Sequence, residues 1–324
     1  MAVLGYAEPF LEPDTMPEAG TKTPVCTLAV LFCLLIPPPV SAEFALQEVA
    51  DGIYVHQGRH LSISAPHNDD IANIGFIVGG DCIAVVDTGG SVAAGRRLYQ
   101  AMREVSSLPV CYVINTHIHF DHVLGNVAFV ERQVKYVGHE NLAGAIEDNR
   151  EFFLQNFADN LGAEGADAVI GPDIIVQDSL QLDLGQRVLS LQARSVAHSH
   201  TDLTVYDHNT RTLWAGDLLF KQRIPALDGS LKGWLQLLDA LQREDIARVV
   251  PGHGPAVLTW PEAMDDQRRY LDVLLQQTRD AIAAGGFMED IVEQVGTQEK
   301  LNWLLYEENH KRNVTRAFTE LEWE

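Results

Sequence analysis

Short runs of apolar residues, several of them alternating with polar ones, fill the chain after residue 43 and predict β-strands. Turn residues separate the first runs at Asp51-Gly52 and at Gly79-Gly80-Asp81, as they do in hairpins. Apolar residues at helical spacing follow between Ala93 and Val105. The strand runs of this first half are Phe44–Val49, Ile53–Gln57, Ile71–Val78, Ile83–Asp87 and Val110–Ile114.

The second half also combines strands with helices. Helical patterns occupy Glu140–Asn160, Trp234–Gln242 and the chain from Pro261 to the end. The strand runs between them are Ile174–Val176, Arg187–Leu191, Leu203–Asp207 and Thr212–Ala215. Two successive blocks of strands and helices predict an α+β fold in which two sheets pack face to face with helices outside. We place this domain at residues 43–258, with a helical C-terminal extension packed on it at residues 259–324.

Residues 1–42 have the pattern of a signal peptide. An apolar run, Val25–Ile36, precedes three prolines and Val40-Ser41-Ala42, a small-x-small cleavage pattern. Four acids lie before this run, and a start at Met16 would give a more ordinary signal. The run is too short to span a bilayer comfortably. We therefore expect a periplasmic or secreted protein with no stable membrane insertion after cleavage, and an uncleaved membrane anchor is the alternative.

The charge of the chain argues against nucleic acid as a partner. Asp and Glu number 45 against 23 Lys and Arg, which gives a net charge of -22. Residues 1–42 hold four acids and one base, so the rest of the chain keeps a charge of -19. Phosphate backbones are repelled by such a surface unless a basic stripe dominates locally, and the sequence shows no such stripe. We expect a small-molecule substrate.

Two cysteines, Cys82 and Cys111, remain once the predicted signal is removed. Each opens a short apolar run, so the two can lie at matching heights on neighbouring strands. An oxidising compartment permits a disulfide between them. We nevertheless favour two buried free thiols, because cysteine is often buried as a small apolar residue.

Three histidines and an aspartate lie within six residues, directly after the strand run Val110–Ile114. In an extended chain alternate residues face the same way, so His117 and His119 converge on one metal ion. The loop then turns, and Asp121 and His122 point to a second ion. Imidazole nitrogen and carboxylate oxygen are the usual ligands of catalytic zinc. The cluster predicts a metal site at a strand end.

The segment Thr116–His122 resembles the His-x-His-x-Asp-His signature of the metallo-β-lactamase superfamily. Four further positions follow in that family's order: Asp87 in Val-Val-Asp-Thr-Gly, His198 in Ala-His-Ser-His, Asp217 in Trp-Ala-Gly-Asp, and His253 in Pro-Gly-His-Gly. The resemblance spans nearly the whole chain after the signal. It implies a four-layer αββα sandwich and a pair of zinc ions.

The resemblance also implies a role for each residue of the site. The first zinc would be held by His117, His119 and His198, and the second by Asp121, His122 and His253, with Asp217 between the two. Asp121 is also our candidate catalytic residue, beside a hydroxide shared by both ions. Asp87 would orient a ligand, and a turn or helix cap is its alternative role. His200 is the alternative to His198, and iron is the alternative metal.

A narrower resemblance concerns the substrate. Asp217 argues against typical zinc β-lactamases, which carry cysteine or serine there, and favours thioesterases, lactonases and phosphodiesterases. The segments Lys221–Ser230, Pro251–Gly254 and His310–Val314, together with Glu320–Glu322, are similar to those of the exported quinoprotein relay system zinc metallohydrolases. Asp217 thus implies a hydrolase acting on a thioester, lactone or related ester, and the narrower similarity implies a functional link to a quinoprotein dehydrogenase.

Substrate contacts are predicted in two segments. Lys221 and Arg223 closely follow Asp217 and are candidates to hold an anionic group, with solvated loop charges as the alternative. The segment 58–70 carries His60 and His67 and is a candidate flap over the metals or an ordinary surface loop.

Three other functions remain open from the sequence. They are a zinc β-lactamase, an iron-dependent persulfide oxygenase with a single metal, and a metal-binding accessory protein without turnover. Fold and ligands alone do not separate an enzyme from such an accessory protein.

Overall fold

The computed structural model describes residues 44–130 and 133–324. The predicted signal peptide, with the possible start at Met16, lies outside these residues. Among the described residues, no helix has both the length and the apolar character needed to cross a bilayer.

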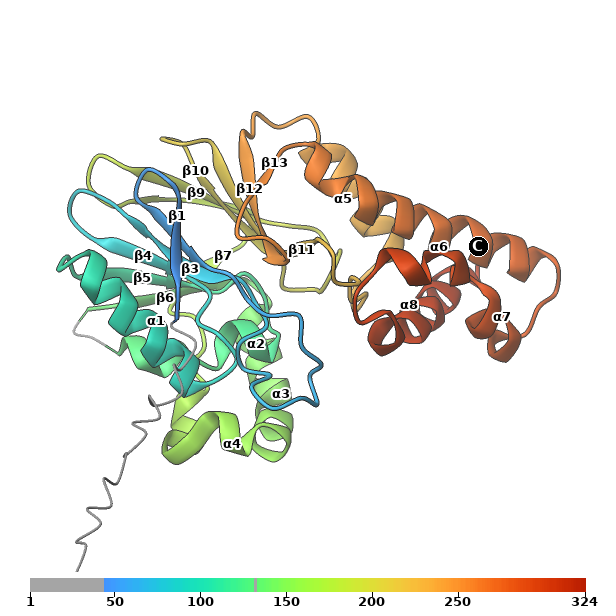
Figure 1. Cartoon of the computed structure of the whole chain (residues 1–324), viewed down its shortest axis with the longest axis horizontal. Helices are drawn as coiled ribbons and strands as arrows, with labels where there is room; N and C mark the ends of the chain where they lie inside the picture. The colour runs from blue at the N-terminus through green and yellow to red at the C-terminus, as the bar shows by residue number, and fades with distance from the viewer. Residues whose placement is uncertain (1–43, 131–132) are drawn as a thin grey trace, which may run out of the picture. The chain divides into compact units, whose positions relative to one another are not determined.

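Thirteen strands in the described residues form two sheets (Figure 1). The first sheet has the order β1-β2-β3-β4-β5-β6-β7 and the second β13-β12-β11-β10-β9-β8. The strands of the first are β1 (Leu46–Ala50), β2 (Ile53–His56), β3 (Ile74–Val78), β4 (Ile83–Val86), β5 (Val110–Ile114), β6 (Lys135–His139) and β7 (Ile174–Val176). Those of the second are β8 (Ser179–Asp183), β9 (Val188–Ala193), β10 (Leu203–Asp207), β11 (Thr212–Phe220), β12 (Arg248–His253) and β13 (Leu258–Thr259).

Helices connect and cover the sheets. The α-helices are α1 (Val92–Val105), α2 (Phe120–Val123), α3 (Leu142–Asn156), α4 (Ala158–Leu161), α5 (Leu231–Leu241), α6 (Asp265–Ala283), α7 (Met288–Gln294) and α8 (Tyr306–Leu321). The short 3₁₀ helices are η1 (Asn126–Phe129), η2 (Gly162–Ala168), η3 (Glu262–Met264) and η4 (Thr297–Asn302).

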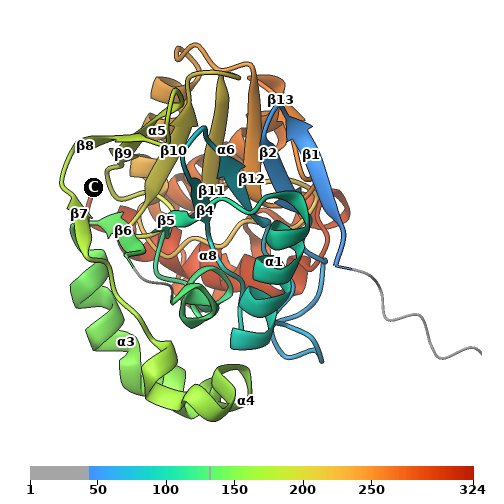
Figure 2. The same ribbon diagram turned by 90° about the vertical axis from the view of Figure 1, so that its left-hand side faces the viewer.

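Alternating side chains on the central strands produce four layers. In β4, Ile83 and Val85 pack with Leu98 of α1, whereas Ala84 and Val86 face the second sheet. This is the two-residue period of a strand buried on both faces. The first sheet therefore lies between α1 and the second sheet, as Figures 1 and 2 show.

The second sheet is covered on its other face by C-terminal helices. In β11, Trp214 packs into the core between the sheets, whereas Leu213 and Ala215 face the opposite way. They join an apolar cluster that includes Trp234 of α5 and Leu271 of α6. The predicted α+β sandwich, with helices outside two packed sheets and further helices after them, is confirmed. The proposed division at residue 258 stays a prediction.

The strand and helix predictions are confirmed in kind but differ in extent. β11 runs on to Phe220 instead of ending at Ala215, so Asp217 lies inside the strand. The predicted helix Glu140–Asn160 is divided into α3 and α4 at Phe157. Four strands were not predicted: β6, β8, β12 and β13.

The expectation of two free thiols is wrong. Cys82 and Cys111 form a disulfide, with their Cα atoms 5.8 Å apart. Cys82 directly precedes β4, Cys111 belongs to β5, and these strands are parallel neighbours. The bond thus joins the two strands that lead to the predicted ligands.

Removal of this disulfide is expected to lower stability. A cross-link that spans 29 residues stabilises the fold by about 3.5 kcal/mol, mainly because it restricts the unfolded chain. Urea unfolding should therefore shift to lower concentration when a reductant is added. The Cys82→Ser/Cys111→Ser variant is the control, and it should unfold at that lower concentration with or without reductant. Identical curves for the native chain in both conditions would contradict the prediction.

Candidate metal centre

Four strands end at one edge of the two sheets, and the predicted ligands lie there. β4 and β5 are parallel neighbours in the first sheet, and β11 and β12 in the second. Asp87 directly follows β4, and His117 lies three residues beyond β5. Asp217 lies within β11, and His253 is the last residue of β12. The carboxyl ends of adjacent parallel strands thus bring residues from distant parts of the chain together.

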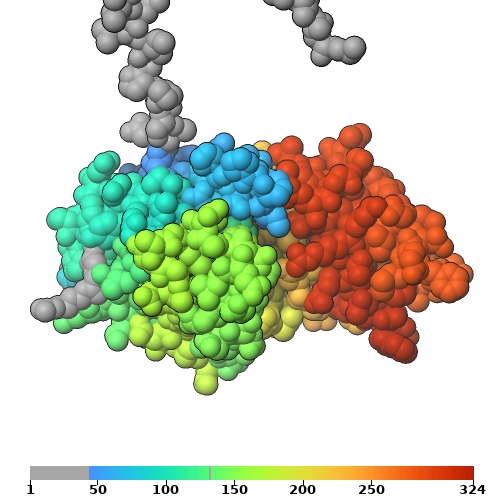
Figure 3. All heavy atoms as spheres, turned by 90° about the horizontal axis from the view of Figure 1, so that it is seen from below, coloured from blue at the N-terminus to red at the C-terminus, as the bar shows by residue number. Residues whose placement is uncertain are grey.

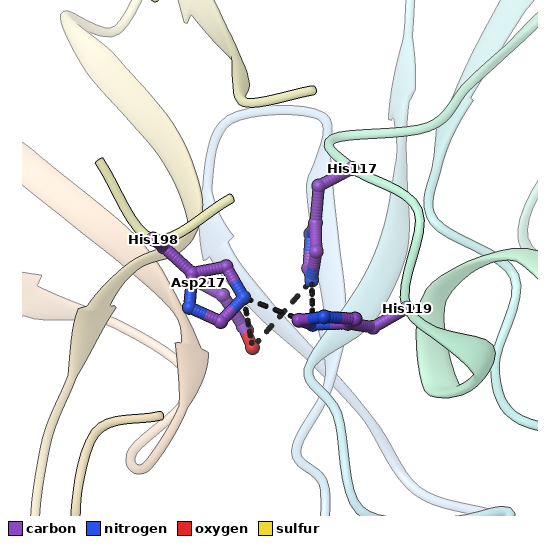
Figure 4. Close-up of side chains that lie close together, drawn as sticks. All are labelled: His117, His119, His198 and Asp217. Atoms are coloured by element: carbon purple, nitrogen blue, oxygen red, sulfur yellow. Dashed lines mark hydrogen bonds and ion pairs between the residues drawn. The ribbon is translucent and has the colours of Figure 1, made fainter. Parts of the chain in front are cut away.

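A first cluster is formed by three imidazoles and one carboxylate that point toward one another (Figure 4). His119 Nδ1 lies 3.1 Å from His117 Nε2 and 2.9 Å from His198 Nε2. Asp217 Oδ2 lies 3.6 Å from His117 Nε2 and 3.4 Å from His198 Nε2. Four ligand atoms therefore surround one point.

A second cluster lies beside the first and consists of Asp121, His122 and His253. Asp121 Oδ2 is 3.6 Å from His122 Nε2 and 3.4 Å from His253 Nε2. Asp217 Oδ1 is 3.2 Å from His122 Nε2 and 3.3 Å from His253 Nε2. The two oxygens of Asp217 therefore face different clusters, which is the geometry of a bridging carboxylate.

Hydrogen bonds at the outer nitrogens of the first cluster fix which nitrogens face inward without a proton. His198 Nδ1 lies 2.7 Å from the Ala226 carbonyl oxygen, which only accepts, so the ring donates there and Nε2 keeps a lone pair. His119 Nε2 lies 3.0 Å from Asp228 Oδ2 and donates to it, which in the neutral ring leaves a lone pair on Nδ1. Two lone pairs facing each other repel unless a cation lies between them.

The second cluster has the same arrangement. His122 Nδ1 donates to Asp87 Oδ2 over 2.8 Å, and His253 Nδ1 donates to the Ile71 carbonyl oxygen over 2.7 Å. In the neutral rings, the form in which imidazole binds a metal ion, both Nε2 atoms therefore present lone pairs to carboxylate oxygens. His122 Nε2 and Asp217 Oδ1 are buried and have no hydrogen-bond partner. Buried polar atoms of this kind are rare and need an explanation.

The spacing of these atoms fits divalent metal ions. Zinc bound tetrahedrally at about 2.0–2.1 Å would hold its ligand atoms about 3.3 Å apart. The contacts given above measure 2.9 to 3.6 Å, and the ligand atoms of each cluster lie within 4.8 Å of one another. Lone pairs, spacing and unpaired atoms together make both clusters suitable for a divalent cation.

The electrostatics of the centre are dominated by burial and by its carboxylates. Burial lowers the pKa of His117 well below its usual value and that of His198 to about 4. At His122 burial acts in the same direction, but the carboxylates around it, Asp217 foremost, raise its pKa well above the usual value. Despite its burial, Asp217 has a pKa well below the usual value because histidines surround it. The carboxylates thus create a negative potential that favours cations.

Asp87 supports both clusters at once. Its carboxylate accepts from Thr116 N, Thr116 Oγ1 and His122 Nδ1, each over 2.8 Å. Thr116 Oγ1 lies 3.1 Å from His117 Nδ1, so the hydroxyl accepts from that ring while it donates to Asp87. Asp87 is buried and has φ +56°, a left-handed conformation that costs energy outside glycine. These contacts match the predicted orienting role better than a helix cap.

Two glycines make room for side chains of the centre, Gly216 for Thr116 and Gly252 for Asp217. A Cβ on Gly216, which has φ +53°, would lie 2.6 Å from Thr116 Oγ1. A Cβ on Gly252 would lie 1.9 Å from Asp217 Oδ1. The side chain of Asp217 can reach both clusters only because residue 252 has none.

Gly252→Ala is expected to displace the Asp217 carboxylate and weaken metal binding. Misplaced support of a metal ligand typically costs about 10–100-fold in affinity or activity. The matched control is Gly144→Ala, because nothing lies within 4 Å of a Cβ at Gly144 in α3. Competition with a chromogenic chelator measures both variants. Equal zinc affinity in the two variants would contradict the proposed role of Gly252.

Other predicted residues lie outside the clusters. His200 is exposed, so His198 rather than His200 joins the first cluster. Lys221 forms an ion pair with Asp266 of α6. His60 lies 3.1 Å from Gln222 Oε1, and His67 is exposed in the segment 58–70 with φ +64°. Of these four side chains only His200 lines the cavity described next.

A cavity of about 560 Å³ opens over both clusters. Its walls include His119, Asp121, Asp217 and His253. Arg223, the remaining predicted substrate residue, also lines it, and the segment 58–70 contributes Ile63. The volume lies within the usual range for small-molecule sites.

Asp228 is the site residue that the sequence prediction missed. It accepts from His119 and also pairs with Arg312 of α8. Burial alone would raise the pKa of Asp228, but the contact with His119 reverses this and holds the pKa far below its usual value. Its only sequence signal was its place among the residues shared with a narrower group of proteins. The C-terminal helices thus reach the candidate metal centre through this carboxylate.

Fold and site together define an αββα sandwich protein with a candidate two-metal centre at the strand ends. A family model described as the Metallo-beta-lactamase superfamily matches residues 67–253. The chain belongs to this superfamily.

Named relatives include hydrolases of two kinds. A linear primary-alkylsulfatase of Pseudomonas sp. (strain ATCC 19151) is 28% identical over 241 residues, covering 62% of this chain but only 43% of the alkylsulfatase. The acyl-coenzyme A thioesterase MBLAC2 of Bos taurus is 25% identical over 240 residues, covering 65% of this chain and 81% of the thioesterase. Similarity to these proteins supports a hydrolase.

Solved structures share the fold. The sec-alkylsulfatase Pisa1 from Pseudomonas sp. superposes with a TM-score of 0.66 at 16% identity, covering 85% of this chain and 50% of its own. A metallo-beta-lactamase from Pontibacter korlensis gives 0.56 at 19% identity, covering 70% of this chain and 98% of its own. At these identities the likeness concerns the fold alone.

Proposed function

We propose that the protein is a two-zinc hydrolase that cleaves a thioester, lactone or related ester. The observation that carries the proposal is Asp217, whose two oxygens face two adjacent clusters of lone pairs. A buried carboxylate that faces lone pairs on both sides is stabilised only if a cation lies in each cluster.

The residues divide between the two ions as the distances indicate. One ion would be held by His117, His119 and His198, and the other by Asp121, His122 and His253, with Asp217 shared. When bound, such ions polarise a substrate oxygen and lower the pKa of water toward neutrality.

The remaining work falls to the chain itself. Asp87 and Asp228 hold ligand rings in place through their outer nitrogens. Asp121 lines the cavity, so its carboxylate is placed to hold a proton released during the reaction.

The thioesterase relative favours a carbonyl substrate, and it shares most of its length with this chain. Sulfate ester hydrolysis is a second candidate, favoured by the alkylsulfatase relative. The choice of zinc over iron rests on the ligands, because imidazole and carboxylate groups suit zinc at open catalytic sites.

We further propose that the protein is exported and acts beside a quinoprotein dehydrogenase. Support for export comes from the pattern of residues 1–42 and from the Cys82–Cys111 disulfide, because disulfides persist in oxidising compartments. Support for the quinoprotein link is confined to the sequence resemblance.

A substrate panel tests the proposal. The zinc-loaded protein should hydrolyse at least one thioester or lactone with a kcat/KM well above that for nitrocefin or a carbapenem. A primary alkyl sulfate and a phosphodiester complete the panel. Turnover of β-lactams at the level of a true lactamase would contradict the proposal, and one iron per chain would favour a persulfide oxygenase. Binding of zinc with no turnover of any ester would favour an accessory role.

A further inference from the structure

A buried arginine, Arg223, faces the cavity without an anionic partner. The residue is 4% exposed and lines the cavity over the metal centre. Its guanidinium donates to the Leu61 carbonyl oxygen over 3.2 Å. Within residues 44–130 and 133–324 no carboxylate forms an ion pair with it. Burial of a charge is costly unless the charge is paired.

The other cations near the cavity differ from Arg223. Arg312 pairs with the Asp228 carboxylate, and Lys221 pairs with Asp266. Arg316 is exposed and donates to the Asp228 backbone oxygen. Only Arg223, among the cations of the described chain near this cavity, is both buried and unpaired. It is therefore the group that a bound anion would stabilise.

The cavity also has an aromatic wall, formed by Phe120, Phe152, Phe153 and Phe157. The rings of Phe120 and Phe157 stack with centroids 4.3 Å apart, and Phe152 lies 5.9 Å from Phe157. Phe152 is 51% exposed, and Ile63, which also lines the cavity, is 56% exposed. Large apolar side chains left open at a cavity indicate an apolar ligand.

The arginine and the aromatic wall come from different parts of the chain. Three of the phenylalanines belong to the α3–α4 segment, whereas Arg223 follows β11. Figure 3 shows the segment 58–70 in blue, the α3–α4 segment in green and the C-terminal helices in red on one face. The candidate metal ligands His119, Asp121, Asp217 and His253 line the same cavity.

We propose that the substrate is an anionic amphiphile whose acidic group pairs with Arg223 and whose apolar chain or ring lies on the aromatic wall. The ester to be cleaved would then lie at the metal centre. This proposal rests on the proposed hydrolase function for the last point only. Binding of the amphiphile requires neither turnover nor a particular ester.

Calorimetric titration with non-hydrolysable probes tests the proposal. Octane-1-sulfonate, used below its micelle concentration, supplies an anion and an apolar chain, and its sulfonate is a weak metal ligand. Octan-1-ol lacks the charge and propane-1-sulfonate lacks the chain. The zinc-loaded native protein should bind octane-1-sulfonate at least about tenfold more tightly than either. Equal affinity for octane-1-sulfonate and octan-1-ol would overturn the proposal without any variant.

Variants locate the two contacts. Arg223→Gln should weaken octane-1-sulfonate binding by about 10–100-fold, the usual effect of losing a hydrogen-bonded charge, and leave octan-1-ol binding unchanged. Arg316→Gln is the matched control and should change the affinity for neither octane-1-sulfonate nor octan-1-ol. Phe157→Ala should weaken octane-1-sulfonate but not propane-1-sulfonate. Loss of affinity in Arg316→Gln instead of Arg223→Gln would place the anion at the rim and overturn the proposal.

Metal content and thermal unfolding of each variant separate this proposal from the proposed function. Arg223→Gln should keep the native zinc content and melting temperature, since Arg223 is not a ligand. Tight octane-1-sulfonate binding together with no hydrolysis of the ester panel would refute the hydrolase and leave the binding site standing. If ester hydrolysis depends neither on substrate charge nor on Arg223, the binding site for an anionic amphiphile is refuted and the hydrolase remains.

Discussion

Asp217→Ala is expected to abolish hydrolysis, with a fall in kcat/KM of about 10³-fold or more. The carboxylate faces both clusters, at 3.4 Å from His198 Nε2 through Oδ2 and 3.2 Å from His122 Nε2 through Oδ1. Without this carboxylate the two proposed metal ions would repel each other with no anion between them. Stabilisation of transition-state charge by a metal centre is worth several kcal/mol, so its loss lowers the rate by orders of magnitude. Zinc content after dialysis should fall below two per chain.

Two further variants sharpen this result. Asp217→Asn keeps the shape of the side chain but removes its charge, so it should lose most of the activity too. Asp245→Ala removes an exposed carboxylate that pairs with Arg211 and should change neither activity nor zinc content. Activity of Asp217→Ala within tenfold of the native protein would show that Asp217 does not bridge metals.

Asp207→Ala is expected to have the largest effect on stability, about 3–5 kcal/mol. Asp207, at the end of β10, pairs with Arg187 over 2.8 Å, and both side chains are buried. Arg187 also donates to the Asp51 and Val78 carbonyl oxygens, so it ties the first sheet to the second. Removal of one partner leaves an uncompensated buried charge, which costs far more than the pair contributes.

Urea unfolding followed by circular dichroism measures this effect. The double variant Arg187→Met/Asp207→Leu should recover much of the lost stability, since it buries no unpaired charge. A loss below about 1 kcal/mol in Asp207→Ala would show that the pair is solvated.

The sequence alone was sufficient for much of the site because its ligands follow strands with a simple pattern. His117 and His119 could be placed in one cluster of candidate metal ligands from strand periodicity after Val110–Ile114. Asp217 could be assigned only through family resemblance, and its position between the two clusters depends on Gly252 of a strand that was not predicted. Pro251 interrupts the apolar run of β12, and proline is a signal against a central strand.

Other features depend on contacts between distant residues. Lys221 and Arg223 look equivalent in the sequence, but one pairs with Asp266 of α6 and the other lines the cavity. Asp228 reaches His119 only because the loop after β11 folds over the first cluster. The disulfide between Cys82 and Cys111 depends on the register of β4 and β5. No local pattern carries such information.

The most direct test of the account is the zinc stoichiometry of the protein as purified, measured by mass spectrometry after dialysis against zinc-limited buffer. We expect two zinc ions per chain, and one or fewer in Asp217→Ala. A native protein that holds a single ion, with a content unaffected by Asp217→Ala, would contradict the two-metal centre.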